Sequence, residues 1–287
     1  MSKTRLCPEC GNSFPGSEER CPHCARPGLY PNVFTAEDVA EADALERRYQ
    51  LARQAGMSRG IDADAAIENF EIAIATTRAV IARPVAELQR LTTNDNEVYA
   101  TFYQLLKAGV RLPTGEKWDT LRGVADEALF SGYKEHIRFA ALSLDGSGLM
   151  NYGKCFIILR TEMIAHRASV FEENSVLFME HQDIRMKDAH KLPHGYRATW
   201  ENRAKLCVAK LAAKIDGATL PDAYSGLLLQ QGRTSEEDDF VEVHIWGPMT
   251  IRTVEEVSLN PREKRAARAI TSRASRERLA KFGVIIK

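Results

Sequence analysis

The sequence predicts an α+β protein made of an N-terminal zinc ribbon, a helical middle region and a mixed-sheet domain closed by a basic helix. Three observations predict this: four cysteines lie within the first 24 residues, apolar residues recur at helical spacing between about residues 35 and 130, and short β-forming runs begin near residue 135. We therefore expect three regions, over residues 1–30, 31–130 and 131–287.

The composition is that of a folded protein able to bury a core. The 287 residues are 44% hydrophobic, and 39 Lys and Arg are balanced by 39 Asp and Glu. A net charge of zero excludes a protein that is basic throughout, although it allows a local basic patch. The N-terminal residues contain no apolar signal segment, and no stretch approaches the ~18 uncharged apolar residues that a membrane span needs. We therefore expect a cytoplasmic protein.

Four of the six cysteines form two CxxC knuckles, CPEC and CPHC, separated by ten residues. Each knuckle presents two thiolates on a tight turn, and two knuckles complete a tetrahedron of Zn–S bonds of about 2.3 Å. Four thiolates leave no open coordination position, so the pattern predicts a structural zinc ion whose binding folds the segment. The alternatives are chance spacing and a redox pair, and His23 is expected to be a bystander. The predicted ligands are Cys7, Cys10, Cys21 and Cys24.

The middle region is predicted to be mainly helical. Thr35 and Asp38 resemble the start of a helix that runs to about Ala55. Further helices are expected over residues 62–84, 94–109 and 118–129. In the first of these, Val80 and Ile81 continue the apolar pattern until a proline interrupts it.

The second half is predicted to contain a sheet. Its strands are expected in four runs, HIRFAALSL, YGKCFIILR, FVEVHIWG and MTIRTVEEV. Because Gly247 and Pro248 separate the last two runs, these strands are expected to pair with each other. Between the early and late strands, Thr199 is expected to cap an amphipathic helix that ends at Gly217.

Two segments carry a family resemblance. The first, GLMNYGKCFIILRTEMIAHRASVFEENSVLF, is followed about 65 residues later by DDFVEVHIWGPMTIRTVEEV. Together they resemble bacterial and phage-associated ADP-ribosyltransferase toxins, over roughly residues 133–258. The positions that match that family's pattern are Tyr152, Gly153, Arg167 to Ser169, Asn174, Ser175, Glu242 and Gly247. The sequence departs from the pattern at His244, where Gln or Glu is usual.

The resemblance implies an ADP-ribosyltransferase-like domain whose substrate is NAD. Glu242 is then the candidate catalytic carboxylate, because breaking the bond between nicotinamide and ribose develops an oxocarbenium-like charge that a carboxylate stabilises. His244 shares a strand face with Glu242 and is the second catalytic candidate. The residues assigned to NAD binding are His136, Arg138, Tyr152, Arg167, Ser169 and Ser175. The alternative is an ordinary half-exposed strand, with Arg138 in a surface ion pair.

The C-terminal segment is predicted to be a basic helix that begins at Asn260. From Arg262 to Lys287 it has nine Lys or Arg and two Glu, a surplus of seven positive charges. One interpretation is a solvated surface, and the other is contact with the phosphates of RNA or DNA. The residues assigned to nucleic-acid contact are Arg265, Arg268, Arg273 and Arg276. Only about fifteen residues separate Glu242 from this helix, so we expect the two to lie side by side.

We therefore expect an NAD-dependent ADP-ribosyltransferase that modifies a macromolecule, nucleic acid included, as a toxin or phage-defence effector, with an antitoxin or other inhibitor protein as a candidate partner. The alternative is a non-catalytic zinc-ribbon protein that binds nucleic acid in a regulatory role. The sequence contains no HExxH, GxGxxG, GxxxxGK[ST] or GxSxG motif, so a catalytic metal site, a Rossmann or P-loop site and a hydrolase triad have no support. A nuclease would need a carboxylate cluster or a His pair, which the sequence does not reveal.

Overall fold

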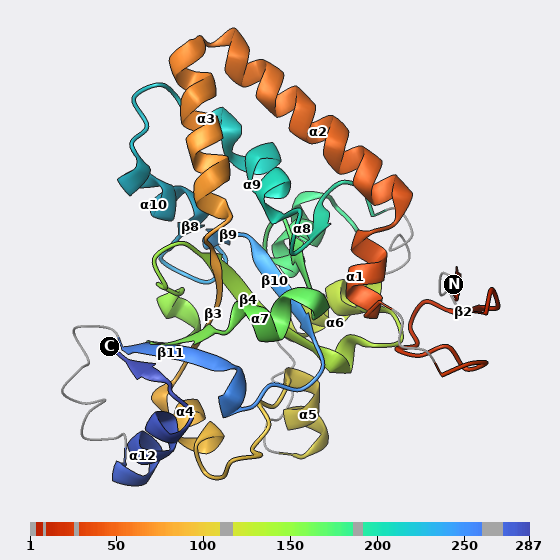
Figure 1. Cartoon of the computed structure of the whole chain (residues 1–287), viewed down its shortest axis with the longest axis vertical. Coiled ribbons are helices and arrows are strands. Elements are labelled where there is room, and N and C mark those ends of the chain that lie inside the picture. Colours follow the sequence, from red (N-terminus) through yellow and green to blue (C-terminus); the bar gives the residue numbers. More distant parts are fainter. Residues whose placement is uncertain (1–3, 8–9, 26–28, 110–116, 186–191, 260–271) are drawn as a thin grey trace.

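The structure, a computed structural model, describes all residues except 1–3, 8–9, 26–28, 110–116, 186–191 and 260–271 (Figure 1). Residues 117–120 are described by their helical backbone alone. The fold class predicted from the sequence is confirmed: the protein is α+β, with an N-terminal four-cysteine cluster, a helical region and a large mixed sheet.

An eight-stranded sheet forms the centre of the fold. Its strands are β3 (Arg78–Arg83), β4 (Ile137–Ser143), β5 (Cys155–Leu159), β6 (Ala168–Phe171), β7 (Arg197–Thr199), β10 (Glu242–Trp246), β11 (Val254–Leu259) and β12 (Ile285–Ile286). They follow the order β12-β11-β5-β3-β4-β10-β6-β7. Neighbours are antiparallel, except that β11 and β12 are parallel. Two small sheets consist of β1 (Thr4–Leu6) with β2 (Ser13–Pro15) and of β8 (Leu229–Gln230) with β9 (Asp239–Phe240).

Helices cover both faces of the large sheet. They are α1 (Pro31–Ala36), α2 (Val39–Ser58), α3 (Ile61–Ile74), α4 (Val85–Leu91), α5 (Phe102–Lys107), α6 (Lys117–Phe130), α7 (Thr161–Ile164), α8 (Ser175–His181), α9 (Arg203–Leu211), α10 (Tyr224–Leu228) and α12 (Arg273–Lys281). α2, α3 and α9 pack together on one face, over the main hydrophobic core, whereas α6 and α8 pack against each other on the other face (Figure 1). Both faces of the central strands are therefore buried.

β10 divides its side chains between two hydrophobic clusters. Val243 and Ile245 belong to the main core, and Trp246 belongs to a second cluster that includes aromatic residues of α6 and α8. Because side chains alternate along a strand, Glu242 and His244 point to the same side as Trp246. The candidate catalytic residues are therefore directed toward α6 and α8.

The expected helix over residues 62–84 is wrong in its second half. α3 ends at Ile74, where the hydroxyl of Thr77 donates to the backbone carbonyl (2.6 Å), and the chain then enters β3. Val80 and Ile81 lie in the middle of the sheet, paired on both sides by β4 and β5. A short apolar run fits a buried strand as well as a buried helix, and two consecutive β-branched residues favour the strand.

The expected pairing of the last two long strands is also wrong. β10 pairs with β4 and β6, β11 pairs with β5 and β12, and three strands separate the two. The turn between them begins at Gly247, whose φ is +78°. On either side of this glycine, the backbone carbonyls of Trp246 and Pro248 accept hydrogen bonds from Arg167 and not from a hairpin partner. Alternation identified each strand, but it carries no information on which strand is the neighbour.

Three predicted helix starts shift by several residues. Asp38, rather than Thr35, caps the long helix α2. Thr199 ends β7, and α9 begins at Arg203. In place of a helix over 94–109, the structure has the six-residue α5, which Thr101 caps.

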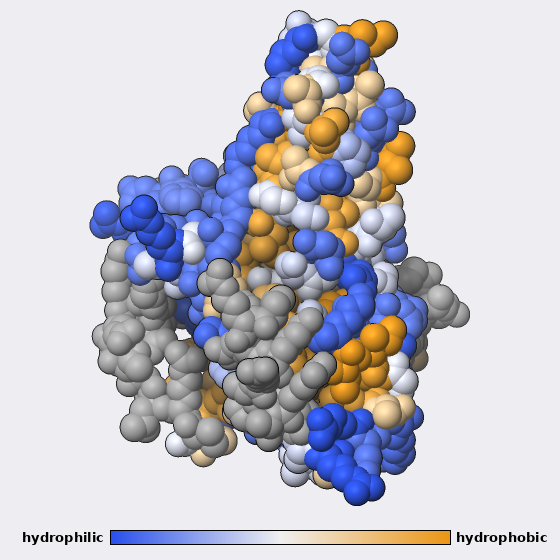
Figure 2. Space-filling view, turned by 90° about the vertical axis from the view of Figure 1, so that its left-hand side faces the viewer, coloured by the Kyte–Doolittle hydropathy of each residue, from blue (hydrophilic) through white to orange (hydrophobic). Residues whose placement is uncertain are grey.

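The α2–α3 hairpin projects from the body of the molecule (Figure 2). Its tip carries exposed apolar side chains among polar ones, including Met57 and Ile61. Among the described residues, every helix is too short or too polar to cross a bilayer.

Candidate active site

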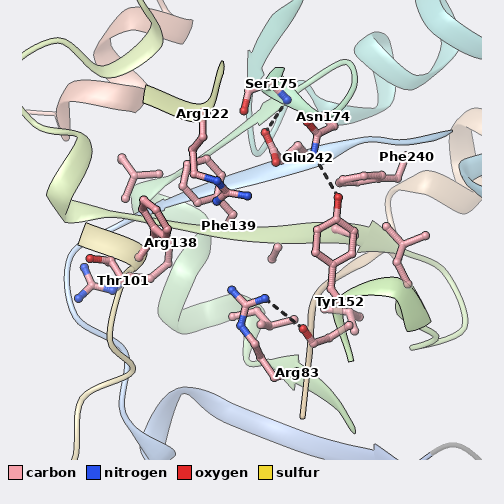
Figure 3. Close-up of a pocket in the computed structure, with 18 of the residues that line it drawn as sticks. Arg83, Thr101, Arg122, Arg138, Phe139, Tyr152, Asn174, Ser175, Phe240 and Glu242 are labelled. Carbon is pink, nitrogen blue, oxygen red and sulfur yellow. Dashed lines mark hydrogen bonds between the residues drawn. The ribbon is translucent and has the colours of Figure 1, made fainter. Parts of the chain in front are cut away.

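A pocket opens on the side of β4 and β10 toward which Glu242 points (Figure 3). Its empty space, counted out to the solvent at its mouth, is about 820 Å³. β3, β4 and β10 supply the floor, and α6, α8, the segment before α5 and the 3-10 turn Met150–Tyr152 supply the sides. The lining includes Arg83, Thr101, Arg122, Asp126, Arg138, Phe139, Tyr152, Asn174, Ser175, Phe240 and Glu242.

Glu242 is held from two sides at the start of β10. Its Oε2 accepts a hydrogen bond from the backbone N–H of Ser175 (3.1 Å) and lies 3.0 Å from Nε2 of His244. Among the described residues, no donor reaches Oε1, so one oxygen stays available to a ligand. All five residues of β10 are buried, which contradicts the half-exposed strand considered as the alternative.

His244 supports Glu242 but does not line the pocket. It is 3% exposed, and its ring is surrounded by the rings of Phe130, Phe139 and Phe171 at centroid distances of 4.7, 5.4 and 5.8 Å. The hydrogen bond to Glu242 is the polar contact of this ring. His244 is therefore placed to orient the carboxylate, not to touch a ligand.

Asn174 joins α8 to the opposite side of the pocket. Its Oδ1 caps α8 by accepting from the backbone N–H of Val176 (2.9 Å), and its Nδ2 donates to the hydroxyl of Tyr152 (3.3 Å). Burial, reinforced by the negative charge of Glu242, raises the pKa of Tyr152. The phenol is therefore protonated at neutral pH and can donate to a ligand.

Arg83 and Arg122 reach into the pocket from opposite sides (Figure 3). The guanidinium of Arg122 lies over the ring of Phe102, 5.4 Å from its centroid. Arg83 follows the apolar part of β3 and donates from Nε to the hydroxyl of Tyr99. Sequence analysis missed both residues: β3, which carries Arg83, was expected to be helical, and the helix that carries Arg122 was expected without a partner strand.

Arg138 is a buried cation without an acidic partner among the described residues. It is 3% exposed, donates to the backbone carbonyl of His136 (3.0 Å), and its Nε has no hydrogen-bond partner. Burial, together with the positive charge of Arg167, lowers the pKa of Arg138 to about 10. The side chain still carries its charge at neutral pH. Because it is buried and has no acidic partner in the described part of the chain, the surface ion pair considered as an alternative is not present there.

Asp126 is a second carboxylate in the same pocket, and sequence analysis missed it. It is 1% exposed, and its Oδ2 accepts from the hydroxyl of Tyr103 (2.7 Å). Burial raises its pKa to about 6 against the opposing effect of this hydrogen bond, and the negative charge of Glu242 acts in the same direction as burial. The available signal was that Arg122 and Asp126, four residues apart on a helix, share one face.

Three residues assigned to NAD binding lie outside the pocket. His136 stacks on Trp246 with centroids 5.0 Å apart. Arg167 donates to three backbone carbonyls, and Ser169 Oγ accepts from Asn32 Nδ2 (3.2 Å). These side chains hold the turn after β10 and the packing of α1. Arg138, Tyr152 and Ser175 are the assigned residues that line the pocket together with Glu242.

The described part of the basic C-terminal helix, α12, contributes no residue to the lining of this pocket, and three strands separate β11, which precedes it, from β10. Residues 260–271 lie outside the described residues, so the expected proximity of the whole helix to Glu242 stays a prediction. Arg265 and Arg268 lie outside the described residues, whereas Arg273 and Arg276 are exposed on α12. Two other cations of this helix form ion pairs with Asp95.

The four N-terminal cysteines converge. Their Sγ atoms all lie within 4.8 Å of one another, with 3.5 Å between Cys7 and Cys24 and 3.6 Å between Cys10 and Cys21. A tetrahedron of 2.3 Å Zn–S bonds has edges of about 3.8 Å, so this arrangement fits a zinc ion. Hydrogen bonds from the backbone and side chain of Asn12 lower the pKa of Cys10 to about 6, which favours the thiolate that a metal binds.

The cysteine module contacts the far end of β10. Trp246 Nε1 donates to the carboxylate of Glu19. Arg5 donates to the carbonyls of Glu18 and Leu29 and lies 5.3 Å from the ring centroid of Phe34 in α1. The module is therefore docked on the same strand that carries Glu242.

No protein-family model matches the chain, and no curated protein sequence matches it. The geometry of the pocket is therefore the basis for assigning a function to the protein.

Proposed function

We propose that the pocket binds NAD and that the protein is an NAD-dependent ADP-ribosyltransferase that modifies a macromolecule. The observation that carries the proposal is the position of Glu242, whose carboxylate is held by two groups at the wall of a pocket that three arginines line. Tyr152, Ser175 and Glu242 come from the two segments that resemble ADP-ribosyltransferases, and they meet in this pocket.

The three arginines favour an anionic ligand. Arg138 carries a buried positive charge with an unpartnered Nε, and such a charge is costly to the fold unless something pairs with it. Arg83 and Arg122 face the same space. Guanidinium groups bind phosphate oxygens through directional, charge-assisted hydrogen bonds, so the pyrophosphate of NAD supplies the missing partner.

Glu242 is placed for the chemical step. Its Oε2 is fixed by Ser175 and His244, so the position of the other oxygen is fixed as well. A carboxylate held in this way stabilises the oxocarbenium-like ribose as the bond to nicotinamide breaks, and its prior orientation avoids a reorganisation cost at that moment. Phe139 and Phe240 offer apolar ring surfaces on which the planar rings of NAD can pack.

The test is transfer of label from NAD. Purified protein is incubated with NAD labelled in its ADP-ribose part and with total cell extract, and labelled protein, RNA and DNA are separated afterwards. Wild type should transfer the label, and Glu242→Gln, which keeps the shape and removes the charge, should reduce transfer and nicotinamide release at least ~100-fold.

Glu255→Gln is the matched control. Glu255 is a strand carboxylate on β11, outside the pocket, and its side chain is 37% exposed. Its removal should leave the rate unchanged. Absence of both transfer and nicotinamide release in wild type, or equal rates for wild type and Glu242→Gln, would contradict the proposed function.

A further inference from the structure

The pocket contains two carboxylates that come from different parts of the chain. Glu242 is at the start of β10, and Asp126 is in the third turn of α6. Both line the same space, and the charge of Glu242 acts on the titration of Asp126. Two carboxyl groups in one pocket with different surroundings is the arrangement by which enzymes divide electrostatic and proton-transfer roles.

The hydrogen bonds of the two groups differ. Glu242 Oε2 is already occupied by Ser175 and His244, which orient it. Asp126 accepts one hydrogen bond, from Tyr103 to Oδ2, and no donor among the described residues reaches Oδ1. Each carboxylate thus keeps one oxygen without a donor, but two groups fix the other oxygen of Glu242, whereas a single hydroxyl holds Asp126. Asp126 is therefore the less constrained of the two as a proton acceptor.

We propose that Asp126 is a catalytic base: its carboxylate accepts the proton of the group that attacks the ribose carbon, whether this is the acceptor macromolecule or water. The inference rests on the proposed function. It assigns to α6 a chemical role that the resemblance, which covers residues from about 133 onward, does not contain.

The step balances without another reactant. The bond between the ribose carbon and the nicotinamide nitrogen breaks, and its electron pair stays on that nitrogen, which becomes neutral. An oxygen or nitrogen of the nucleophile forms the new bond to the ribose carbon. The proton of this nucleophile moves to Asp126, which later releases it to water.

The surroundings of Asp126 support this role. Burial raises its pKa to about 6, so the group is a carboxylate at pH 7 and is a stronger base than an exposed aspartate. The charged and titratable groups that act on it are Tyr103 of α5, Arg122 of α6, Glu242 of β10 and Lys134, which follows α6. The hydrogen bond from Tyr103 lowers this pKa, so its removal should raise it.

The experiment measures nicotinamide release from NAD between pH 5 and pH 8 for wild type, Asp126→Asn, Tyr103→Phe and Glu242→Gln. In wild type the rate should fall below a pH of about 6 as Asp126 is protonated. Asp126→Asn should be about 100-fold slower at pH 7.5 and should lose this acidic limb. Tyr103→Phe should retain the limb but shift it to higher pH, a change that a purely structural role of Asp126 would not produce.

Binding is measured in parallel. Because Asn keeps the size of Asp126, the variant should fold, and NAD should raise its melting temperature as much as that of wild type. If Asp126→Asn releases nicotinamide at the wild-type rate and with the same acidic limb, while Glu242→Gln does not, the inference is overturned and the proposed function stands. If wild type releases no nicotinamide at any pH, the proposed function fails, and the inference fails with it.

Discussion

The polar residues at the pocket fall into two sets that differ in how they are paired. In the first set, which we call the ordered wall, Glu242, Asn174 and Ser175, with His244 behind them, are joined by hydrogen bonds among themselves or to the backbone of α8. In the second set, the charged wall, Arg83, Arg122, Arg138 and Asp126 lie around the space without an ion pair among the described residues. The polar side chains of the ordered wall thus hold one another in place, whereas those of the charged wall remain available to a ligand.

The difference separates orientation from binding. Hydrogen bonds within the ordered wall hold the reacting carboxylate before a ligand arrives, which is the condition for electrostatic stabilisation of a transition state. The unpaired cations of the charged wall remain free to bind an anionic ligand, and their burial without a partner destabilises the ligand-free fold. Substitutions on the two walls should therefore change stability in opposite directions.

The largest expected effect is on NAD affinity. Arg138→Met should weaken NAD binding about 100-fold, since a buried charge-assisted hydrogen bond to phosphate contributes about 1.5–3 kcal/mol. The same change should raise the melting temperature of the ligand-free protein, because it removes a buried cation that has no acidic partner. Calorimetric titration with NAD and thermal unfolding without it measure the two effects.

Arg167→Met is the matched control for Arg138→Met. Arg167 is also buried, but it donates to three backbone carbonyls and does not line the pocket. Its removal leaves these carbonyls without their donor, so it should lower the melting temperature. Destabilisation by both substitutions, combined with wild-type NAD affinity in Arg138→Met, would show that the two walls do not differ in this way.

The next effect concerns stability and pH. The folded-state pKa of Asp126 is about 6, whereas an aspartate in an unfolded chain has a pKa of about 3.9. Between these values the folded protein holds a proton that the unfolded chain has lost. The stabilisation that this group provides is thus fully present below a pH of about 4 and is lost as the pH rises through 6. Asp126→Asn should therefore increase the free energy of unfolding at pH 8 by about 3 kcal/mol, and much less at pH 4.

Urea unfolding of wild type and Asp126→Asn at the two pH values measures this difference. A second variant, Asp216→Asn, is a control, because Asp216 is an exposed carboxylate whose pKa is lowered by hydrogen bonds from Thr219. It should give no stabilisation at pH 8. Equal stability of wild type and Asp126→Asn at pH 8 would show that the buried charge of Asp126 does not destabilise the fold.

The two walls also differ in how far the sequence predicted them. Tyr152, Ser175 and Glu242 lie in segments whose local pattern indicated their role, and alternation along β10 placed Glu242 and His244 on one face. Arg83 was missed because an apolar run of four residues does not distinguish a strand from a helix. Asp126 was missed because nothing in the sequence of α6 tells which strand it packs beside.

The fold shows the same limit. Four-cysteine spacing, helical periodicity and β-rich runs were sufficient for the fold class, since each is a local pattern. These local patterns did not predict which strands are neighbours. β10 and β11 follow each other in the chain, yet three other strands lie between them in the sheet. His136 was expected at the start of the strand run HIRFAALSL, but it belongs to the 3-10 turn Lys134–His136 before β4, where alternation does not apply.

The smallest effect expected on the pocket comes from the cysteine module, which contacts Trp246 at the far end of β10. We predict one tightly bound zinc ion per chain and its loss in a Cys7→Ser/Cys24→Ser variant. His23→Ala should keep the metal, because the four sulfurs already complete a tetrahedron. Elemental analysis of the purified proteins measures the zinc content, and a wild type without zinc, or equal loss in His23→Ala, would contradict the assignment.

Loss of zinc should unfold the module and leave the large sheet folded. Within the described part of the module, the hydrophobic cluster consists of Cys7, Phe14 and Cys21, and it is separate from the main core. Metal binding must therefore supply most of its folding free energy. The groups that hold Glu242 come from α8 and β10, not from the module. Nicotinamide release should therefore change less than about threefold, the size expected from one partly buried hydrogen bond at the far end of β10. A collapse of the rate on zinc removal would instead show that the ordered wall depends on the contact between Glu19 and Trp246.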